Sequence, residues 1–316
     1  MHFRTQIPIS KCDLPMDYNS QIVSLGSCFA ENIGKKLDYF KFQNEVNPFG
    51  IIFNPISIEK LIERAINKIE FSERDIFFHN ERWHCYEVHS DLSNSNPTVF
   101  LQNLNQILES TYHQIAKSTH LIITYGTSWV YRNIASNEIV ANCHKVPQNQ
   151  FVKEILSVEA IEQSIQNTID VIKSVNPNCA FIFTISPVRH IKDGFIENQR
   201  SKAHLISAIN QIIHYPLSII HYFPSYEIMM DELRDYRFYA EDMLHPNPVA
   251  IDYIWERFSQ TQISEACYPI MDEVDSIQKG LTHRPFNRDS ESHHKFIKNL
   301  QFKISQIQEK LPFITF

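Results

Sequence analysis

Hydrophobic residues follow two alternating patterns along most of the chain. Short apolar runs, most of them stopped by Gly or Pro, are typical of buried strands. Longer stretches place apolar side chains three or four positions apart, which is typical of helices with one buried face. Residues 77–88 mix aromatic and polar side chains without either period, and no element is predicted there. The patterns predict strands over residues 21–25, 121–125, 180–185 and 217–223, and helices over 29–40, 56–69, 99–116 and 197–213, from Ser157 to Asn176, and from Pro248 onward under an Asn247 cap.

Strands that alternate with helices predict an α/β fold, with a parallel sheet covered by helices on both faces. In such sheets ligands bind beyond the carboxyl ends of the strands. Four polar clusters follow predicted strands or the connections after them, at residues 26–28, 126–128, 186–189 and 242–245. We therefore expect these clusters to share one rim of the sheet.

The carboxyl-terminal part has a different pattern. Residues 282–291 are polar, and the next stretch carries an apolar stripe at helical spacing. The stripe predicts a helix packed on the core or on a second subunit, so a homo-oligomer formed through this helix is one interpretation. We expect a domain over residues 1–265 and a helical extension over 266–316. The stripe consists of Phe296, Leu300, Ile304, Ile307 and Leu311.

Composition narrows the classes of function. The formal net charge of -7, with both signs interspersed, leaves no broad basic surface, so nucleic acid is not an expected partner. The six glycines form no dinucleotide-binding, P-loop or G-x-S-x-G motif. Scattered cysteines and histidines without ligand spacing predict reduced thiols, no metal and no cofactor. Apolar runs too short for a signal peptide or a membrane span predict a cytoplasmic protein.

Two local patterns carry groups suited to nucleophilic chemistry. Asp242 precedes His245 by three residues, close enough to fix the imidazole tautomer through Nδ1 and leave Nε2 as a base. Ser27 and Cys28 stand at a strand-to-helix turn, where helix amides favour a thiolate or a developing oxyanion. Each pattern also has an ordinary interpretation: a capped surface turn for the first, and a capping serine beside a buried cysteine for the second.

Six short motifs, taken in order, resemble those of the GSCFA family. They are residues 25–32 (LGSCFAEN), 47–50 (NPFG), 126–131 (GTSWVY), 142–145 (NCHK), 186–190 (SPVRH) and 242–246 (DMLHP). The likeness covers roughly residues 3 to 260, and several ordered motifs are far more specific than one. The GSCFA family in turn resembles the SGNH hydrolases, or GDSL-like esterases. That resemblance implies a flavodoxin-like sheet and an esterase-like site.

Carried over residue by residue, the resemblance implies that His245 is the base and Asp242 orients it. Aligning Gly26 with the glycine of the SGNH motif Gly-Asp-Ser places Cys28 at the nucleophile and Ser27 at the aspartate. A shift of one residue would make Ser27 the nucleophile, which suits ordinary ester hydrolysis better. Both residues are kept as candidates, with Cys28 preferred.

The resemblance also implies an oxyanion hole. Gly50 matches its glycine, and the family's G-x-N motif corresponds to Gly126-Thr127-Ser128, so that a Ser128 hydroxyl replaces an amide donor. Asn142 or His144 could substitute for that donor. Arg189 has a planar fork suited to a substrate carboxylate or phosphate, or to an ion pair at the rim. His190 and Trp129 have contact and packing interpretations of equal weight.

Three functions are compatible with these patterns. The first is an acyl hydrolase (esterase) or acyltransferase acting on a small ester or an O-acylated carbohydrate, a substrate class that the SGNH resemblance implies. The second is a ligand-binding or scaffold protein that keeps the fold without turnover. The third is a cysteine redox or thioester protein.

Overall fold

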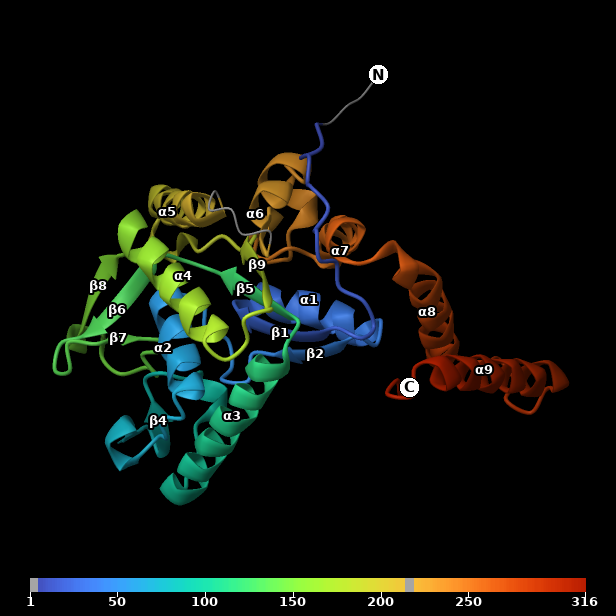
Figure 1. Ribbon diagram of the computed structural model, residues 1–316, viewed down its shortest axis with the longest axis horizontal. Coiled ribbons are helices and arrows are strands. Elements are labelled where there is room, and N and C mark those ends of the chain that lie inside the picture. The colour runs from blue at the N-terminus through green and yellow to red at the C-terminus, as the bar shows by residue number, and fades with distance from the viewer. Residues whose placement is uncertain (1–4, 214–218) are drawn as a thin grey trace.

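The computed structural model describes residues 5–213 and 219–316, and its centre is a parallel sheet (Figure 1). The strands lie in the order β10-β9-β5-β1-β2, and every neighbouring pair is parallel. This is the flavodoxin-like order, whose reversal point lies between β1 and β5. The strands are β1 (Gln21–Gly26), β2 (Gln43–Val46), β5 (His120–Tyr125), β9 (Ala180–Ile185) and β10 (Ile220–Phe223).

The continuous apolar runs in the central strands have a direct structural reason. Successive side chains point to opposite faces, so Leu121 and Ile123 enter one core and Ile122 enters the other. Both cores need apolar residues, which removes the usual alternation with polar ones. The predicted strands 121–125 and 180–185 are confirmed, and the first two residues of the predicted strand 217–223 lie outside the described residues.

Helices cover both faces of the sheet, as the sequence predicts. The first core packs under α2 (Pro55–Ile66), α3 (Pro97–Lys117), α4 (Val158–Lys173) and α5 (Phe195–Ile213). The second packs under α1 (Cys28–Tyr39) and α7 (Pro248–Gln262). The predicted caps form, because Ser157 accepts the Ala160 N–H at 3.2 Å and Asn247 accepts the Ala250 N–H at 3.0 Å.

The predicted helix 56–69 is too long. It ends at Ile66, because Lys68 adopts a left-handed φ of 53° and the chain leaves the helix axis. Ile69, whose apolar side chain fits the helical spacing, is consequently 52% exposed.

Two small antiparallel sheets, which the sequence did not predict, accompany the central parallel sheet. The unassigned stretch 77–88 contains part of a hairpin between β3 (Ile76–His79) and β4 (Arg82–Cys85). Its turn uses Asn80 and Glu81, both at positive φ, and has no glycine to announce it. A second small sheet joins β7 (Ile139–Val140), β6 (Trp129–Asn133) and β8 (Phe151–Ile155) in that order.

The carboxyl-terminal helices α8 (Tyr268–Thr282) and α9 (Glu291–Lys310) pack against each other and extend away from the sheet (Figure 1). Leu300 and Ile307 of the predicted stripe are buried, whereas Phe296 is 38% exposed. Gly280 allows the two helices to approach, because a Cβ there would lie 2.7 Å from Leu300 Cδ1. Across residues 5–213 and 219–316, every helix is too short or too polar to span a bilayer.

Candidate active site

The turn after β1 places Cys28 at the point where the strand order reverses. Gly26 has φ 134°, and a Cβ on it would lie 2.1 Å from the Thr124 carbonyl oxygen of β5. The Ser27 N–H donates to that same oxygen at 3.0 Å. The close approach of β1 and β5 therefore requires glycine, and it brings the start of α1 to the position where flavodoxin-like sheets bind ligands.

Ser27 and Cys28 have different environments although they are neighbours. Ser27 is 1% exposed and caps α1, since its Oγ accepts the Phe29 N–H at 3.2 Å. Cys28 is the first residue of α1 and is half-buried. Burial raises the pKa of the Cys28 thiol and Glu31 adds to this, whereas Lys202 and the backbone N–H groups of Cys28 and Phe29 lower it.

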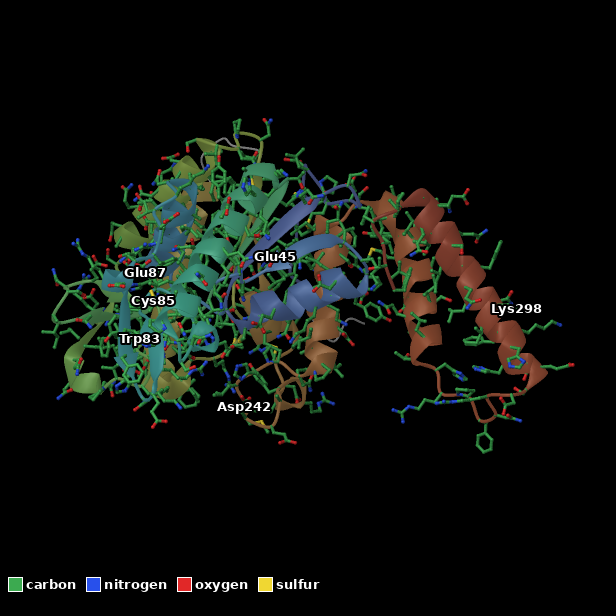
Figure 2. All side chains as sticks on the ribbon, turned by 90° about the horizontal axis from the view of Figure 1, so that it is seen from below. Glu45, Trp83, Cys85, Glu87, Asp242 and Lys298 are labelled. Atoms are coloured by element: carbon green, nitrogen blue, oxygen red, sulfur yellow. The ribbon has the colours of Figure 1, made fainter. Side chains whose placement is uncertain are left out.

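Asp242 and His245 form a hydrogen-bonded pair in the loop between η6 (Tyr236–Phe238) and α7. Asp242 Oδ2 lies 2.5 Å from His245 Nδ1, and Oδ1 accepts the backbone N–H groups of Leu244 and His245. These backbone donors, followed by the imidazole, lower the pKa of Asp242 to about 2. The side chains remain 45% and 47% exposed, and Figure 2 shows Asp242 at the edge of the domain. His245 Nε2 is the ring nitrogen left for acid–base chemistry.

Arg189 forms side-chain and backbone hydrogen bonds to the loop that carries Asp242 and His245. Its guanidinium donates to the Met243 carbonyl, and its backbone N–H donates to the Leu244 carbonyl at 3.3 Å. The guanidinium also lies over the rings of Tyr239 and Tyr236, at 4.4 Å and 5.2 Å from the centroids. Arg189 therefore connects the segment after β9 to the loop that carries the carboxylate and the imidazole.

A pocket of about 550 Å³ opens beside the loop. Aromatic residues of the small β7-β6-β8 sheet and of the sheet rim line it together with His245. Within the described residues, its wall ends short of Ser27 and Cys28, and no hydrogen bond joins either of them to His245. Residues of this wall include Phe53, Trp129, Tyr131, Asn142, Cys143, Arg189 and His190.

Lys202 is a site residue that the sequence did not single out. It lies on the buried face of α5, it is 1% exposed, and its Nζ donates to the Gly126 and Ser186 carbonyls at 2.7 Å each. Burial lowers the pKa of Lys202 to about 7, against an opposing effect of Cys28. The available signal was a lysine in phase with the apolar residues Leu205 and Ile209 of a predicted helix.

His190 follows β9 and lines the pocket. Its ring stacks on Phe53, and its Nε2 is buried without a hydrogen-bond partner among the described residues. Burial, followed by the positive charges of Lys202 and His245, lowers the pKa of His190 to about 3.

The expected oxyanion donors are mostly engaged within the fold. The Gly50 N–H donates to the Asn47 carbonyl at 2.7 Å, and the Gly126 N–H donates to the Phe53 carbonyl at 2.8 Å. Ser128 is fully buried, and both its N–H and its hydroxyl bond to Ser201 of α5. These three groups are therefore occupied by bonds that hold the rim together.

Asn142 lines the pocket, whereas His144 is buried against the β3–β4 hairpin. Asn142 faces the pocket, with its Oδ1 accepting the His144 N–H at 2.8 Å. His144 is 4% exposed, and its Nε2 lies 2.7 Å from the Cys85 carbonyl oxygen. Burial lowers the pKa of His144 to about 4, so its ring is a neutral packing group beside His84.

A further feature of the described residues is the distribution of their metal-ligating side chains. Throughout residues 5–213 and 219–316, no group of three or more His, Cys, Asp or Glu residues could hold a metal ion.

Comparison with known proteins gives a result at the level of the family. A search of curated proteins finds no match to the chain. The family model described as GSCFA family matches residues 21–258, which include both Cys28 and His245. A second model, described as GSCFA domain protein, C-terminal domain, matches residues 274–316. The first match covers well over half of the chain, and the chain therefore belongs to the GSCFA family.

Proposed function

We propose that this protein is an acyl hydrolase or acyltransferase in which Cys28 is the nucleophile, His245 the acid–base and Asp242 its orienting carboxylate. The observation that carries the proposal is the hydrogen bond between Asp242 and His245, together with the position of His245 in the wall of the pocket. The geometry supplies a base fixed in one tautomer. The class of reaction, acyl transfer, follows from the SGNH resemblance of the motifs.

In the proposed reaction, His245 accepts the thiol proton and the Cys28 thiolate attacks the carbonyl carbon of an ester. The bond to the alcohol oxygen breaks, the alkoxide takes the proton from His245, and a thioester remains on Cys28. Water or a second hydroxyl then attacks the thioester after giving its proton to His245. The carbon–sulfur bond breaks to release the acid or the new ester, and the leaving thiolate takes the proton back from His245, which restores the enzyme.

Cys28 is preferred to Ser27 because of what each side chain already does. The Ser27 hydroxyl is buried and accepts a helix N–H, so its use as a nucleophile would remove the cap of α1. Burial keeps the pKa of the Cys28 thiol above its ordinary value, and the backbone N–H groups of Cys28 and Phe29 oppose this rise. The pocket aromatics Trp129 and Tyr131 favour an apolar or sugar-like ester over a highly charged one.

The binding hypothesis has an observation in its favour as well. The pocket wall reaches His245 but not Cys28 within the described residues, and the N–H groups of Gly50, Gly126 and Ser128 are already bonded. A protein with these features could hold a ligand beside His245 without turning it over. The two hypotheses differ in whether a thiol-dependent acyl intermediate forms.

The test is hydrolysis of p-nitrophenyl acetate by wild type, Cys28→Ala and Ser27→Ala, with mass spectrometry of the acylated protein. The proposal expects acylation and turnover to be lost in Cys28→Ala and kept in Ser27→Ala. Cys143→Ala is the matched control, because Cys143 is a half-buried thiol of the pocket wall whose pKa burial raises to about 11.

The opposite result for Ser27→Ala and Cys28→Ala would move the nucleophile to Ser27. No turnover across a panel of acyl esters, with a ligand still bound at the pocket, would favour the binding protein.

A further inference from the structure

The turn that carries Cys28 is held from two sides. On one side, the Ser27 N–H donates to the Thr124 carbonyl of β5 at 3.0 Å. On the other side, the Gly26 N–H donates to the side-chain Oδ1 of Asn47 at 2.8 Å, and this hydrogen bond is buried. Asn47 directly follows β2, which pairs with β1. The backbone two residues before Cys28 is therefore fixed by a side chain from the end of the neighbouring strand.

Asn47 replaces a backbone bond of the parallel ladder with a bond of its side chain. Its N–H donates to the Ser24 carbonyl at 2.9 Å, which continues the pairing of β1 with β2. In a regular parallel ladder, the carbonyl of the same residue would accept the N–H two positions further along β1, which is that of Gly26. The Asn47 carbonyl instead accepts the Gly50 N–H at 2.7 Å, and the side-chain oxygen takes its place. The chain can therefore leave the sheet at Asn47 while Gly26 remains bonded.

The backbone conformation at residue 47 restricts which side chains can make this bond. Asn47 has a φ of 46°, in the left-handed region that asparagine and aspartate adopt more readily than other non-glycine residues. Asn47 and Gly26 are both buried, so a Gly26 N–H without this acceptor would be costly. The position needs a short side chain with an acceptor oxygen, and asparagine provides it.

The loop at residues 47–54 also contributes to the pocket. The Ile52 N–H donates to the Gly26 carbonyl at 3.2 Å, so this loop holds both backbone groups of Gly26. The turn of Cys28 and one part of the pocket wall are therefore built on the same loop. The residues of this loop that line the pocket are Ile51, Phe53 and Asn54.

We propose that Asn47 is a positioning residue for Cys28, whose side-chain oxygen fixes the Gly26 amide and with it the direction of the turn that carries the thiol. The inference rests on the proposed function in taking Cys28 as the nucleophile. Reaction rates are sensitive to misplacements of about 1 Å, so a turn that loses this bond should react more slowly even in a folded protein. The bond and the accessibility of the thiol can be measured without any substrate.

The first experiment measures amide hydrogen exchange of Gly26 by NMR in wild type, Asn47→Gly and Asn47→Asp. Asn47→Gly removes the acceptor and keeps a residue that adopts the positive φ, so the Gly26 amide should exchange at least about tenfold faster. Asn47→Asp keeps an acceptor oxygen at the same position and should restore slow exchange. Rapid exchange in the wild type, or equal exchange in wild type and Asn47→Gly, would overturn the proposal.

Asn80→Gly is the matched control. Asn80 is exposed and has a φ of 45° in the turn between β3 and β4, so the same substitution is made at the same backbone conformation in another element. Exchange of the Gly26 amide should be equal in Asn80→Gly and wild type. An equal acceleration in Asn80→Gly and Asn47→Gly would show a general loosening of the protein and would count against the role of Asn47.

The second experiment compares two reactions of Cys28 that differ in their need for orientation. Hydrolysis of p-nitrophenyl acetate requires an aligned thiol, so Asn47→Gly should lower kcat roughly 10- to 100-fold while KM stays within about twofold. Alkylation by iodoacetamide, with the rate extrapolated to full ionisation of the thiol and the residue identified by mass spectrometry, requires only access. A loosened turn should make this half-buried thiol react faster. A parallel decrease of both rates would contradict a positioning role.

The outcomes separate this inference from the proposed function. Protection of the Gly26 amide by Asn47 and faster alkylation in Asn47→Gly, without ester turnover by the wild type, would support Asn47 as the group that holds the Cys28 turn while the acyl hydrolase fails. Turnover that depends on Cys28 and is unchanged in Asn47→Gly would support the hydrolase and refute the role of Asn47.

Discussion

The two halves of the candidate site are built in opposite ways. Asp242 and His245 stand three residues apart in an exposed loop, and their hydrogen bond needs only one turn of chain. The half-buried Cys28 begins α1 and the buried Lys202 belongs to α5, and both lie at the same end of the sheet only because the strands pair between them. Hydrogen bonds from backbone N–H groups lower the pKa of Asp242 in the first pair, whereas burial is the main perturbation in the second.

The comparison shows where electrostatic control lies. An exposed carboxylate–imidazole pair is screened by water, so its value lies in orientation. A buried ammonium is weakly screened and acts on its neighbour over a longer distance. We therefore expect the loop to supply orientation for proton transfer, and burial to have the larger effect on the acidity of Cys28.

The largest effect is expected when the His245 imidazole is removed, because the loop would then have no base. His245→Ala is expected to lower kcat/KM for p-nitrophenyl acetate about a thousandfold, because no other base replaces it. Tm should hardly change, since the side chain is half exposed. His113→Ala, an exposed histidine on α3, is the control. Undiminished hydrolysis by His245→Ala would remove the loop from the mechanism.

Arg189 tests whether the loop works through orientation. Arg189→Ala removes the bond to Met243 and the contacts with Tyr236 and Tyr239, and should lower kcat/KM roughly 10- to 100-fold. Hydrogen exchange over residues 240–247 should become faster. Arg189→Lys keeps the charge but loses the planar stacking, so it should restore little. Equal exchange rates in wild type and Arg189→Ala would show that the loop needs no such support.

Lys202 tests the buried half through the pH dependence of stability. A folded pKa near 7, below the ordinary 10.5, means that the unfolded state binds more protons between these values. The wild-type free energy of unfolding should therefore rise with pH in this window, by up to about 1.4 kcal/mol per unit relative to Lys202→Met. Urea unfolding of both proteins at pH 7.5, 8.5 and 9.5 measures it. Parallel curves would indicate an ordinary lysine.

Ser27 is expected to give the smallest effect. Ser27→Ala removes the cap of α1 and should cost about 1 kcal/mol of unfolding free energy, with hydrolysis within a few-fold of wild type. Ser157→Ala is a matched control, because Ser157 caps α4 through the same type of bond. Similar losses of stability in the two variants, with activity kept, would place Ser27 in structure alone. Loss of activity in Ser27→Ala only would reopen its role as nucleophile.

The predictability of the fold follows from burial. Strands β5 and β9 are enclosed on both faces and are therefore continuous apolar runs that a sequence reveals. The edge strand β2, Gln43–Val46, is polar and half exposed, so its pattern resembles a loop. The β3–β4 hairpin turns through Asn80 and Glu81 without a glycine, so the usual signal for a tight turn is missing.

The candidate site divides in the same manner. The spacing of Asp242 and His245 suffices to suggest their bond, because the partners are neighbours in sequence. Nothing in the chain near Gly50 or Ser128 indicates that their N–H groups bond to Asn47 and Ser201 instead of facing a ligand. Whether an N–H group is free to bind a ligand depends on the acceptors that surround it in the folded protein, and a sequence motif does not contain this information.

By itself, the sequence determined a parallel sheet between helices and a carboxylate three residues before an imidazole, since both follow from local periodicity and spacing. Only the tertiary structure decided that Lys202 of α5 is buried against the Gly126 and Ser186 carbonyls and that Arg189 holds the loop of His245. The physical reason is the range of the interactions. Periodicity reflects which face of an element is buried, whereas the charge beside a buried group depends on strands and helices far away in the chain.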